Sequence, residues 1–218
     1  MRIRKKPYAK SELLASSVYI DDPENYRGKW NDLFSEKRPL SIELGCGKGK
    51  FISEMAHTDR ERNFVAVDIK DEMLLLAKRN IENIFADEED INARITAYNI
   101  EQIDKVFAPE DDIDTVYINF CNPWPKSKHN KHRLTHTRQL ETYKKFLAPG
   151  AKIYFKTDDR GLYEATKAYF AECGFEIVFD SDDFSVKSFE NNIQTEHEKM
   201  FLDYGETIKG IIAVLKEG

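Results

Sequence analysis

Short apolar runs alternate with helical patterns along most of the chain, and this alternation is what most constrains the fold. The runs are rich in Val, Ile, Tyr and Phe, which buried, pleated strands favour. Continuous apolar strands separated by helices predict an α/β fold, with a mostly parallel sheet covered by helices on both faces. We expect seven strands, the last two closing the sheet with one antiparallel edge strand. Their expected positions are residues 40–44, 63–69, 93–100, 114–120, 151–158, 175–179 and 208–216.

Three helices are predicted from apolar residues that recur at helical spacing. Their apolar positions are Leu74, Ala77, Ile81 and Ile84 after a cap at Asp71, then Leu140, Tyr143 and Leu147, and then Leu162, Thr166, Tyr169 and Cys173. These elements predict one domain over residues 31–218. Residues 1–30 show no clear period and are expected to form a mobile, basic N-terminal arm.

The composition argues against a membrane or secreted protein. No apolar run in the 218 residues approaches the ~18 that a spanning helix needs, and the basic start MRIRKKPYAK is not followed by the apolar stretch of a secretory signal. The three cysteines, Cys46, Cys121 and Cys173, form no C-x-x-C pair. Isolated thiols of this kind are typical of a reduced compartment, so we expect a cytoplasmic protein.

Positive charge is concentrated in two segments of an otherwise acidic chain. The net charge is -6, yet residues 1–10 hold five cations and no acid, and residues 126–133 hold four cations and no acid. A chain with its charges separated in this way can present a local basic face to a nucleic acid. For the N-terminal segment, an ordinary solvated surface explains the charges equally well.

Polar residues follow five of the predicted strands at the point where each strand ends. Because ligands of open α/β sheets bind beyond the carboxyl ends of the strands, these residues predict a polar cleft along one edge of the sheet. They are Glu43 with the loop Gly45–Gly49, Asp68, Asn99, the segment from Asn119 to Lys126, and Asp158.

The glycine loop indicates which kind of ligand this cleft takes. Its glycines, Gly45, Gly47 and Gly49, follow Glu43 in the pattern E-x-G-x-G-x-G, which differs from the dinucleotide pattern G-x-G-x-x-G. A carboxylate before the loop would repel a pyrophosphate but suits a cationic ligand such as S-adenosylmethionine. Asp68, at the end of the second strand, is placed to accept hydrogen bonds from ribose hydroxyls. The alternative is that the glycines only form a strand-to-helix turn.

The glycine loop is similar to that of class I S-adenosylmethionine-dependent methyltransferases, which have a Rossmann-like fold. Three further segments, NFCNPWPKSKHNKHR, FKTDD and TEHEK, resemble the bacterial tRNA (guanine-N7-)-methyltransferases. The resemblance runs from the glycine loop nearly to the C-terminus. It implies transfer of a methyl group to N7 of a guanine in the variable loop of tRNA, with S-adenosylmethionine as the methyl donor and no metal.

The resemblance also implies roles for individual residues. The donor contacts would be Glu43, Gly45, Gly47, Gly49, Asp68, Asn99 and Asn122, and the substrate contacts Lys126, Asp158, Thr195, Glu196, His197 and Glu198. The RNA contacts would be Lys128, His129, Lys131, His132 and Arg133. Asn122 and Asp158 are the expected catalytic residues. The expected partner is tRNA, with no membrane and no obligate protein partner, and the chain would act as a monomer or homodimer.

Asn122 departs from the family, which usually has an Asp at this position. An asparagine cannot act as a general base, but guanine N7 carries an in-plane lone pair and no hydrogen. Positioning therefore does most of the work in this reaction. Asp158 and Glu198 are the candidates for stabilising the positive charge that develops on the base.

Several residues allow two interpretations. Trp124 could stack on a base or anchor its loop. Thr195 and Glu198 also fit a helix-capping box, which is compatible with a substrate role. Cys46 and Cys121 are expected to be packed thiols rather than nucleophiles. His129, His132 and His136 match no zinc pattern and are better explained by an RNA-facing surface.

Three other functions compete with this prediction. The chain could be a class I methyltransferase for another base or a small molecule, because Asn122-Pro123-Trp124 resembles the NPPY-type motif of amino-group methyltransferases. It could be an RNA-binding module with a degenerate donor pocket. A nicotinamide-dependent dehydrogenase is the weakest alternative, because the third glycine is misplaced.

Overall fold

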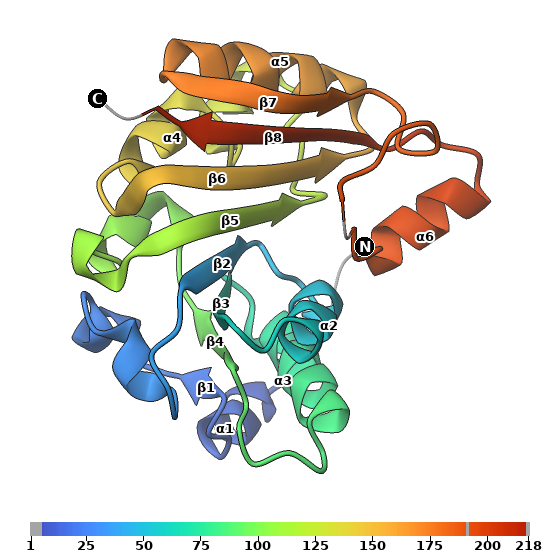
Figure 1. Cartoon of the computed structure of the whole chain (residues 1–218). Helices are drawn as coiled ribbons and strands as arrows, with labels where there is room; N and C mark the ends of the chain where they lie inside the picture. The colour runs from blue at the N-terminus through green and yellow to red at the C-terminus, as the bar shows by residue number, and fades with distance from the viewer. Residues whose placement is uncertain (1–5, 191, 217–218) are drawn as a thin grey trace.

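The computed structural model describes residues 6–190 and 192–216, and these form one eight-stranded sheet with helices on both faces (Figure 1). The predicted α/β class with a mostly parallel sheet is confirmed. The strands are β1 (Tyr19–Ile20), β2 (Leu40–Leu44), β3 (Asn63–Asp68), β4 (Ala93–Ala97), β5 (Ile113–Asn119), β6 (Leu147–Thr157), β7 (Phe175–Ser181) and β8 (Lys209–Leu215). The α-helices are α1 (Ala9–Leu14), α2 (Lys50–Thr58), α3 (Asp71–Ile84), α4 (Thr137–Tyr143), α5 (Arg160–Glu172) and α6 (Glu196–Asp203). Short 3₁₀ helices are η1 (Pro23–Tyr26), η2 (Trp30–Leu33), η3 (Ile100–Lys105), η4 (Pro109–Asp111) and η5 (Ser127–His132).

The strand order is β1-β4-β3-β2-β5-β6-β8-β7, and only β8 runs against its neighbours. Two details differ from the expectation of seven strands with an antiparallel strand at the edge. The strand β1 adds an eighth strand beside β4, and β8 lies between β6 and β7. An inner position suits β8, since its apolar residues Ile211 and Ala213 are fully buried.

The described part of the expected N-terminal arm is packed into the domain. Leu13 of α1 is fully buried, and β1 pairs in parallel with β4. Trp30 is also fully buried, and its Nε1 donates a hydrogen bond of 2.9 Å to the carbonyl of Val106. The expectation of a free arm was therefore wrong for residues 9–30, because their apolar side chains complete the core. The basic residues Arg2, Arg4 and Lys5 lie outside the described residues.

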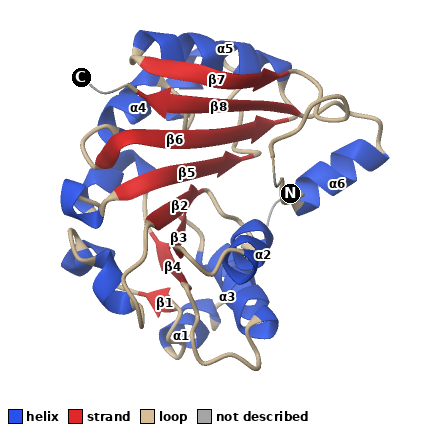
Figure 2. Ribbon diagram, viewed as in Figure 1, coloured by secondary structure: helices blue, strands red, loops and turns tan. Residues whose placement is uncertain are grey.

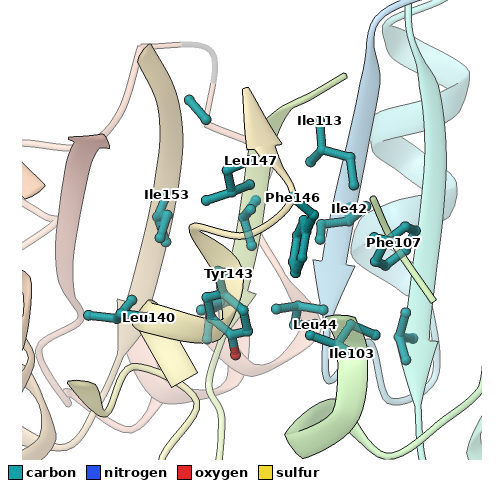
Figure 3. Packing of buried hydrophobic residues seen from close by; sticks show 14 of the residues in the cluster. Ile42, Leu44, Ile103, Phe107, Ile113, Leu140, Tyr143, Phe146, Leu147 and Ile153 are labelled. Carbon is teal, nitrogen blue, oxygen red and sulfur yellow. The ribbon is translucent and has the colours of Figure 1, made fainter. Parts of the chain in front are cut away.

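Apolar side chains fill the space between the sheet and the helices on each face. Figure 3 shows part of the larger cluster, in which Ile42 and Leu44 of β2 pack near Tyr143 and Phe146. A second cluster lies between the sheet and α1, α2 and α3. Leu147 was expected to extend α4, but the helix ends at Tyr143 and Leu147 begins β6, where it pairs with Ile113.

The parallel strands β2 to β6 bring their carboxyl ends to one edge of the sheet, as Figure 2 shows. In the connection from β7 to β8, α6 stands beyond this edge, apart from the helices that cover the sheet (Figure 1). Within the described part of the chain, no helix combines the length and apolarity needed to cross a membrane.

Candidate active site

A cavity of about 470 Å³ opens at the carboxyl edge of the sheet and gathers most of the predicted polar residues. One wall, called the strand-end wall below, consists of Glu43, the loop Gly45–Gly49, Asp68 and Asn99. A second part of the lining, called the loop wall, consists of residues 120–122, Trp124 and Thr195–His197. The prediction that residues far apart in the sequence share one cleft is therefore confirmed for these positions.

The glycine loop takes backbone conformations that favour glycine. Gly45, Gly47 and Gly49 have φ values of 81°, 54° and 69°. At Gly49 a Cβ atom would lie 2.5 Å from the Cβ of Ala77, so any side chain here would collide with α3. The amide of Gly47 donates a hydrogen bond of 3.0 Å to Asp68 Oδ2, which ties the loop to the end of β3.

Glu43 is a buried carboxylate with one unsatisfied oxygen. Its Oε1 accepts a hydrogen bond of 3.2 Å from Asn119 Nδ2, while its Oε2 is buried with no partner among the described residues. Burial raises the pKa of Glu43 from 4.5 to about 8. An unpaired buried carboxylate at a cavity is a fitting partner for a cationic ligand, which would restore its charge and its missing contact.

Asn119 belongs to this site; the sequence predicted it at the polar edge of the sheet but gave it no ligand contact. It ends β5, which pairs with β2, and this register brings its amide to Glu43. Its Oδ1 is also buried without a partner in the part of the chain that the structure describes. In the sequence, its position at the end of a predicted strand is the feature that indicates a place at this edge.

The segment that follows β5 holds strained backbone. Phe120 and Trp124 have φ values of 50° and 45°, which residues other than glycine adopt at a cost of about 1–3 kcal/mol each. Asn122 Oδ1 accepts a hydrogen bond of 3.0 Å from the amide of Trp124. Strain of this kind is found where a loop must present particular groups to a ligand, and this loop lines the cavity.

The start of α6 completes the loop wall. Thr195 Oγ1 accepts a hydrogen bond of 3.0 Å from the amide of Glu198, as the capping pattern predicted. Glu196 forms an ion pair of 2.8 Å with Lys48 of the glycine loop, and this contact lowers the pKa of Glu196. The ring of His197 stacks on Phe120, with centroids 5.8 Å apart.

Two predicted contact residues are placed differently from expectation. Glu198 does not line the cavity, because its carboxylate is 2% exposed and pairs with Lys156 at 2.9 Å. Arg133 is also buried, and its Nε donates a hydrogen bond of 2.8 Å to the carbonyl of Pro123. Arg133 therefore supports the loop at Asn122 to Lys126 and does not present its charge to solvent.

The other predicted RNA contacts lie near or beyond the cavity. Lys126, Lys128 and Lys131 are exposed. His132 lines the cavity and lies 2.6 Å from Glu101 Oε1, while His129 packs near Trp124.

Trp124 lines the cavity, and its ring also packs on His132 with centroids 5.3 Å apart. Asp158 was also expected in this cleft, but it follows β6 half-buried without lining the cavity, and its backbone carbonyl accepts a hydrogen bond of 2.9 Å from Lys209.

Two thiols line the cavity without the properties of nucleophiles. Burial raises the pKa of Cys121 to about 12 and also raises the pKa of Cys46. Both are therefore neutral thiols at physiological pH, as expected of packed residues. Among the residues that the structure describes, no group of three or more His, Cys, Asp or Glu side chains could hold a metal ion.

A parallel sheet of this order, with a glycine loop and acidic strand ends at its carboxyl edge, defines a class I methyltransferase. Solved structures agree with this fold. A methyltransferase from Pyrococcus furiosus aligns with a TM-score of 0.57 at 18% identity, over 85% of this chain and 79% of that one. The antibiotic-resistance methyltransferase Kmr aligns with a TM-score of 0.56 at 15% identity, over 83% of this chain and 88% of that one.

Sequence relatives define the family more closely. Residues 37–211 match the family model described as "Putative methyltransferase". The tRNA (guanine-N(7)-)-methyltransferase of Acetivibrio thermocellus is 48% identical over 99% of this chain and 100% of the relative. The protein of the same name from Ruminiclostridium cellulolyticum is 49% identical over 100% of this chain and 93% of the relative. The chain belongs to the bacterial tRNA (guanine-N7-)-methyltransferase family.

Proposed function

We propose that this protein transfers the methyl group of S-adenosylmethionine to N7 of a guanine in the variable loop of tRNA. The observation that carries the proposal is the unpaired buried oxygen of Glu43 in a cavity whose loop wall holds Asn122, Trp124 and Thr195–His197. The near full-length similarity to proteins named for this reaction supports it.

The strand-end wall holds the donor in this proposal. Glu43 receives the positively charged part of the donor, and the carboxylate of Asp68 accepts hydrogen bonds from ribose hydroxyls. Gly45, Gly47 and Gly49 allow the backbone to approach the ligand closely, and Asn99 contacts it from the end of β4. When bound, S-adenosylmethionine supplies an electrophilic methyl group on a sulfonium.

The loop wall positions the guanine. Because N7 has a free lone pair, no group has to remove a proton before attack, and alignment of the base supplies most of the acceleration. Asn122, held by its contact with the Trp124 amide, orients the base or the donor by hydrogen bonds. Asp158 is the carboxylate that stabilises the positive charge developing on the ring, and Trp124 offers a stacking surface.

The exposed lysines outside the cavity contact tRNA phosphates. Lys126, Lys128 and Lys131 are exposed on one short segment beside the loop wall, with His129 and His132 near them. Contacts of this kind position the RNA without reading its sequence and make binding depend on salt. Since the substrate is tRNA, we place the enzyme in the cytoplasm.

A methyl-transfer assay tests the proposal. The protein is incubated with labelled S-adenosylmethionine and an unmodified tRNA transcript, and the modified base is mapped by aniline cleavage. We expect label in RNA and cleavage at one guanine of the variable loop. A matched transcript with 7-deazaguanosine at that position should accept no label.

Other outcomes identify the competing functions. Label that persists in the 7-deaza transcript would indicate methylation of another atom. Binding of tRNA without binding of the donor, measured by calorimetry, would indicate an RNA-binding module.

A further inference from the structure

The helix α6 carries part of the loop wall but stands apart from the helical layers of the fold. Its cap Thr195 and its first residues, Glu196 and His197, line the cavity. Figure 1 shows α6 beyond the strand ends, in the connection between β7 and β8. Contacts outside the helical layers must therefore position the first turn of α6.

A buried ion pair joins the first turn of α6 to the sheet. Lys156 Nζ on β6 lies 2.9 Å from Glu198 Oε2, and their side chains are 3% and 2% exposed. Among residues 6–190 and 192–216, this is the only ion pair with both partners buried to this degree.

The same ammonium also holds the segment that leads into α6. It donates a hydrogen bond of 3.0 Å to the carbonyl of Ile193 and another to Asn192 Oδ1. Asn192 Nδ2 in turn donates a hydrogen bond of 2.8 Å to Glu198 Oε1. Lys156 of β6 thus binds hydrogen-bond acceptors both in the segment before α6 and in the first turn of α6.

Aromatic rings shield this network from water. Lys156 Nζ lies 5.6 Å, 5.8 Å and 5.7 Å from the ring centroids of Phe51, Phe184 and Phe189. In such surroundings either charge would be strongly unfavourable without the other. The two side chains must therefore stay in contact, which fixes where Glu198 lies relative to β6. The ion pair of Glu196 with Lys48 is different, because its side chains are 40% and 43% exposed and such contacts contribute little.

We propose that Lys156 is a positioning residue that sets the first turn of α6, and with it Thr195, Glu196 and His197, against the cavity. Glu198 then acts through Lys156 and does not touch the guanine. The proposal rests on the proposed function for its consequence in catalysis, but the placement of α6 can be tested without any activity.

The test compares Lys156→Met, Glu198→Gln, the double variant and Lys156→Arg. Lys152→Met is the matched control, since Lys152 is an exposed lysine on the same strand. Hydrogen exchange of the amides in residues 195–203 reports on α6 directly. Melting temperature, the dissociation constant for S-adenosylmethionine and kcat/KM for tRNA complete the measurements. If either single variant does not fold, the double variant carries the test, since it leaves neither an unpaired buried carboxylate nor an unpaired buried ammonium.

We expect exchange across α6 to accelerate by about tenfold in Lys156→Met, Glu198→Gln and the double variant. The kcat/KM for tRNA should fall by about 10–100-fold in each variant. The loss in the double variant should be no larger than that in a single variant, because the two residues act as a unit. Donor affinity should change much less. Lys156→Arg should recover part of the activity, and Lys152→Met should match the wild type.

The proposal is wrong if α6 exchanges at the wild-type rate in Lys156→Met and Glu198→Gln. It is equally wrong if the activity for tRNA falls only in proportion to donor affinity. Failure of the proposed function has a separate signature, since the wild-type protein would then label no tRNA while the exchange of α6 still decides the role of Lys156.

Discussion

The strand-end wall and the loop wall line one cavity, but different kinds of contact hold them in place. The strand-end wall is built from the ends of paired parallel strands, and the Gly47 amide donates a hydrogen bond to the Asp68 carboxylate within it. The loop wall depends on side chains from distant segments, as in the pairs Lys156–Glu198 and Lys48–Glu196. Changes in the first wall should therefore affect the donor, and changes in the second should affect the RNA.

The largest effect is expected at Gly49 in the strand-end wall. A Gly49→Ala substitution places a methyl group against α3 at a positive φ, so the free energy of unfolding should fall by about 2–4 kcal/mol and donor binding should be lost. Gly150→Ala is the control, because Gly150 has a φ of 75° but no atom within 4 Å of the new Cβ. Its cost should be about 1 kcal/mol in urea unfolding. Equal losses in the two variants would show that the close approach to Ala77 does not matter.

The largest catalytic effect is expected at Asp158, which follows β6 and lies outside both walls. An Asp158→Asn substitution keeps the shape of the side chain and removes its charge, so kcat/KM for tRNA should fall by about 100-fold. Donor affinity, measured by calorimetry, should not change. If donor affinity falls as much as kcat/KM, Asp158 acts on the donor and not on the base.

The protonation of Glu43 predicts a pH dependence that is specific to the strand-end wall. Burial raises the pKa of Glu43 from 4.5 to about 8, so the folded free protein holds a proton that the unfolded chain has lost. Stability of the free protein should therefore fall as the pH rises between these two values, while affinity for the cationic donor should rise.

The comparison with Glu43→Gln isolates this effect, since other titrating groups cancel in the difference. Melting temperatures of the free proteins, measured from about pH 5 to 9, should diverge as the pH rises, with the variant becoming the more stable. A difference that stays constant with pH would show that Glu43 does not titrate in this range.

A smaller effect is expected from the exposed lysines beside the loop wall. Lys128→Ala should reduce the slope of log Kobs against log salt for tRNA by about 1. Arg133→Ala should leave this slope unchanged and lower activity instead, because Arg133 supports the carbonyl of Pro123. The reverse pattern would show that Arg133 contacts RNA after all.

The smallest effect is expected at Asn122. In Asn122→Asp, a carboxylate oxygen can still accept the hydrogen bond of the Trp124 amide, and no proton has to be removed from N7. Steady-state kinetics should show activity that is unchanged or higher. An inactive variant that still binds the donor would contradict the idea that this position needs no base.

The difference between the two walls also explains which parts could be predicted from the sequence. Glu43, Asp68 and the glycine loop are encoded locally, because a strand period and a glycine pattern determine where each residue lies. Parallel pairing then brings the strand ends together without further information.

Long-range side-chain contacts were not predictable. Glu198 was expected to contact the substrate and Arg133 the RNA, but both side chains are buried against partners within the fold. The two-residue strand β1 is too short to show a period, so residues 9–30 looked irregular. In the same way, Leu147 fits a helical stripe and was separated from α4 only by its pairing with Ile113.

The central claim is that one cavity holds the methyl donor on its strand-end wall and faces it with the loop wall. A crystal structure with S-adenosylhomocysteine tests this most directly. The account predicts Glu43 and Asp68 in contact with the ligand and its sulfur atom facing Asn122. A ligand bound elsewhere, or one that leaves the carboxylate of Glu43 without a contact, would contradict it.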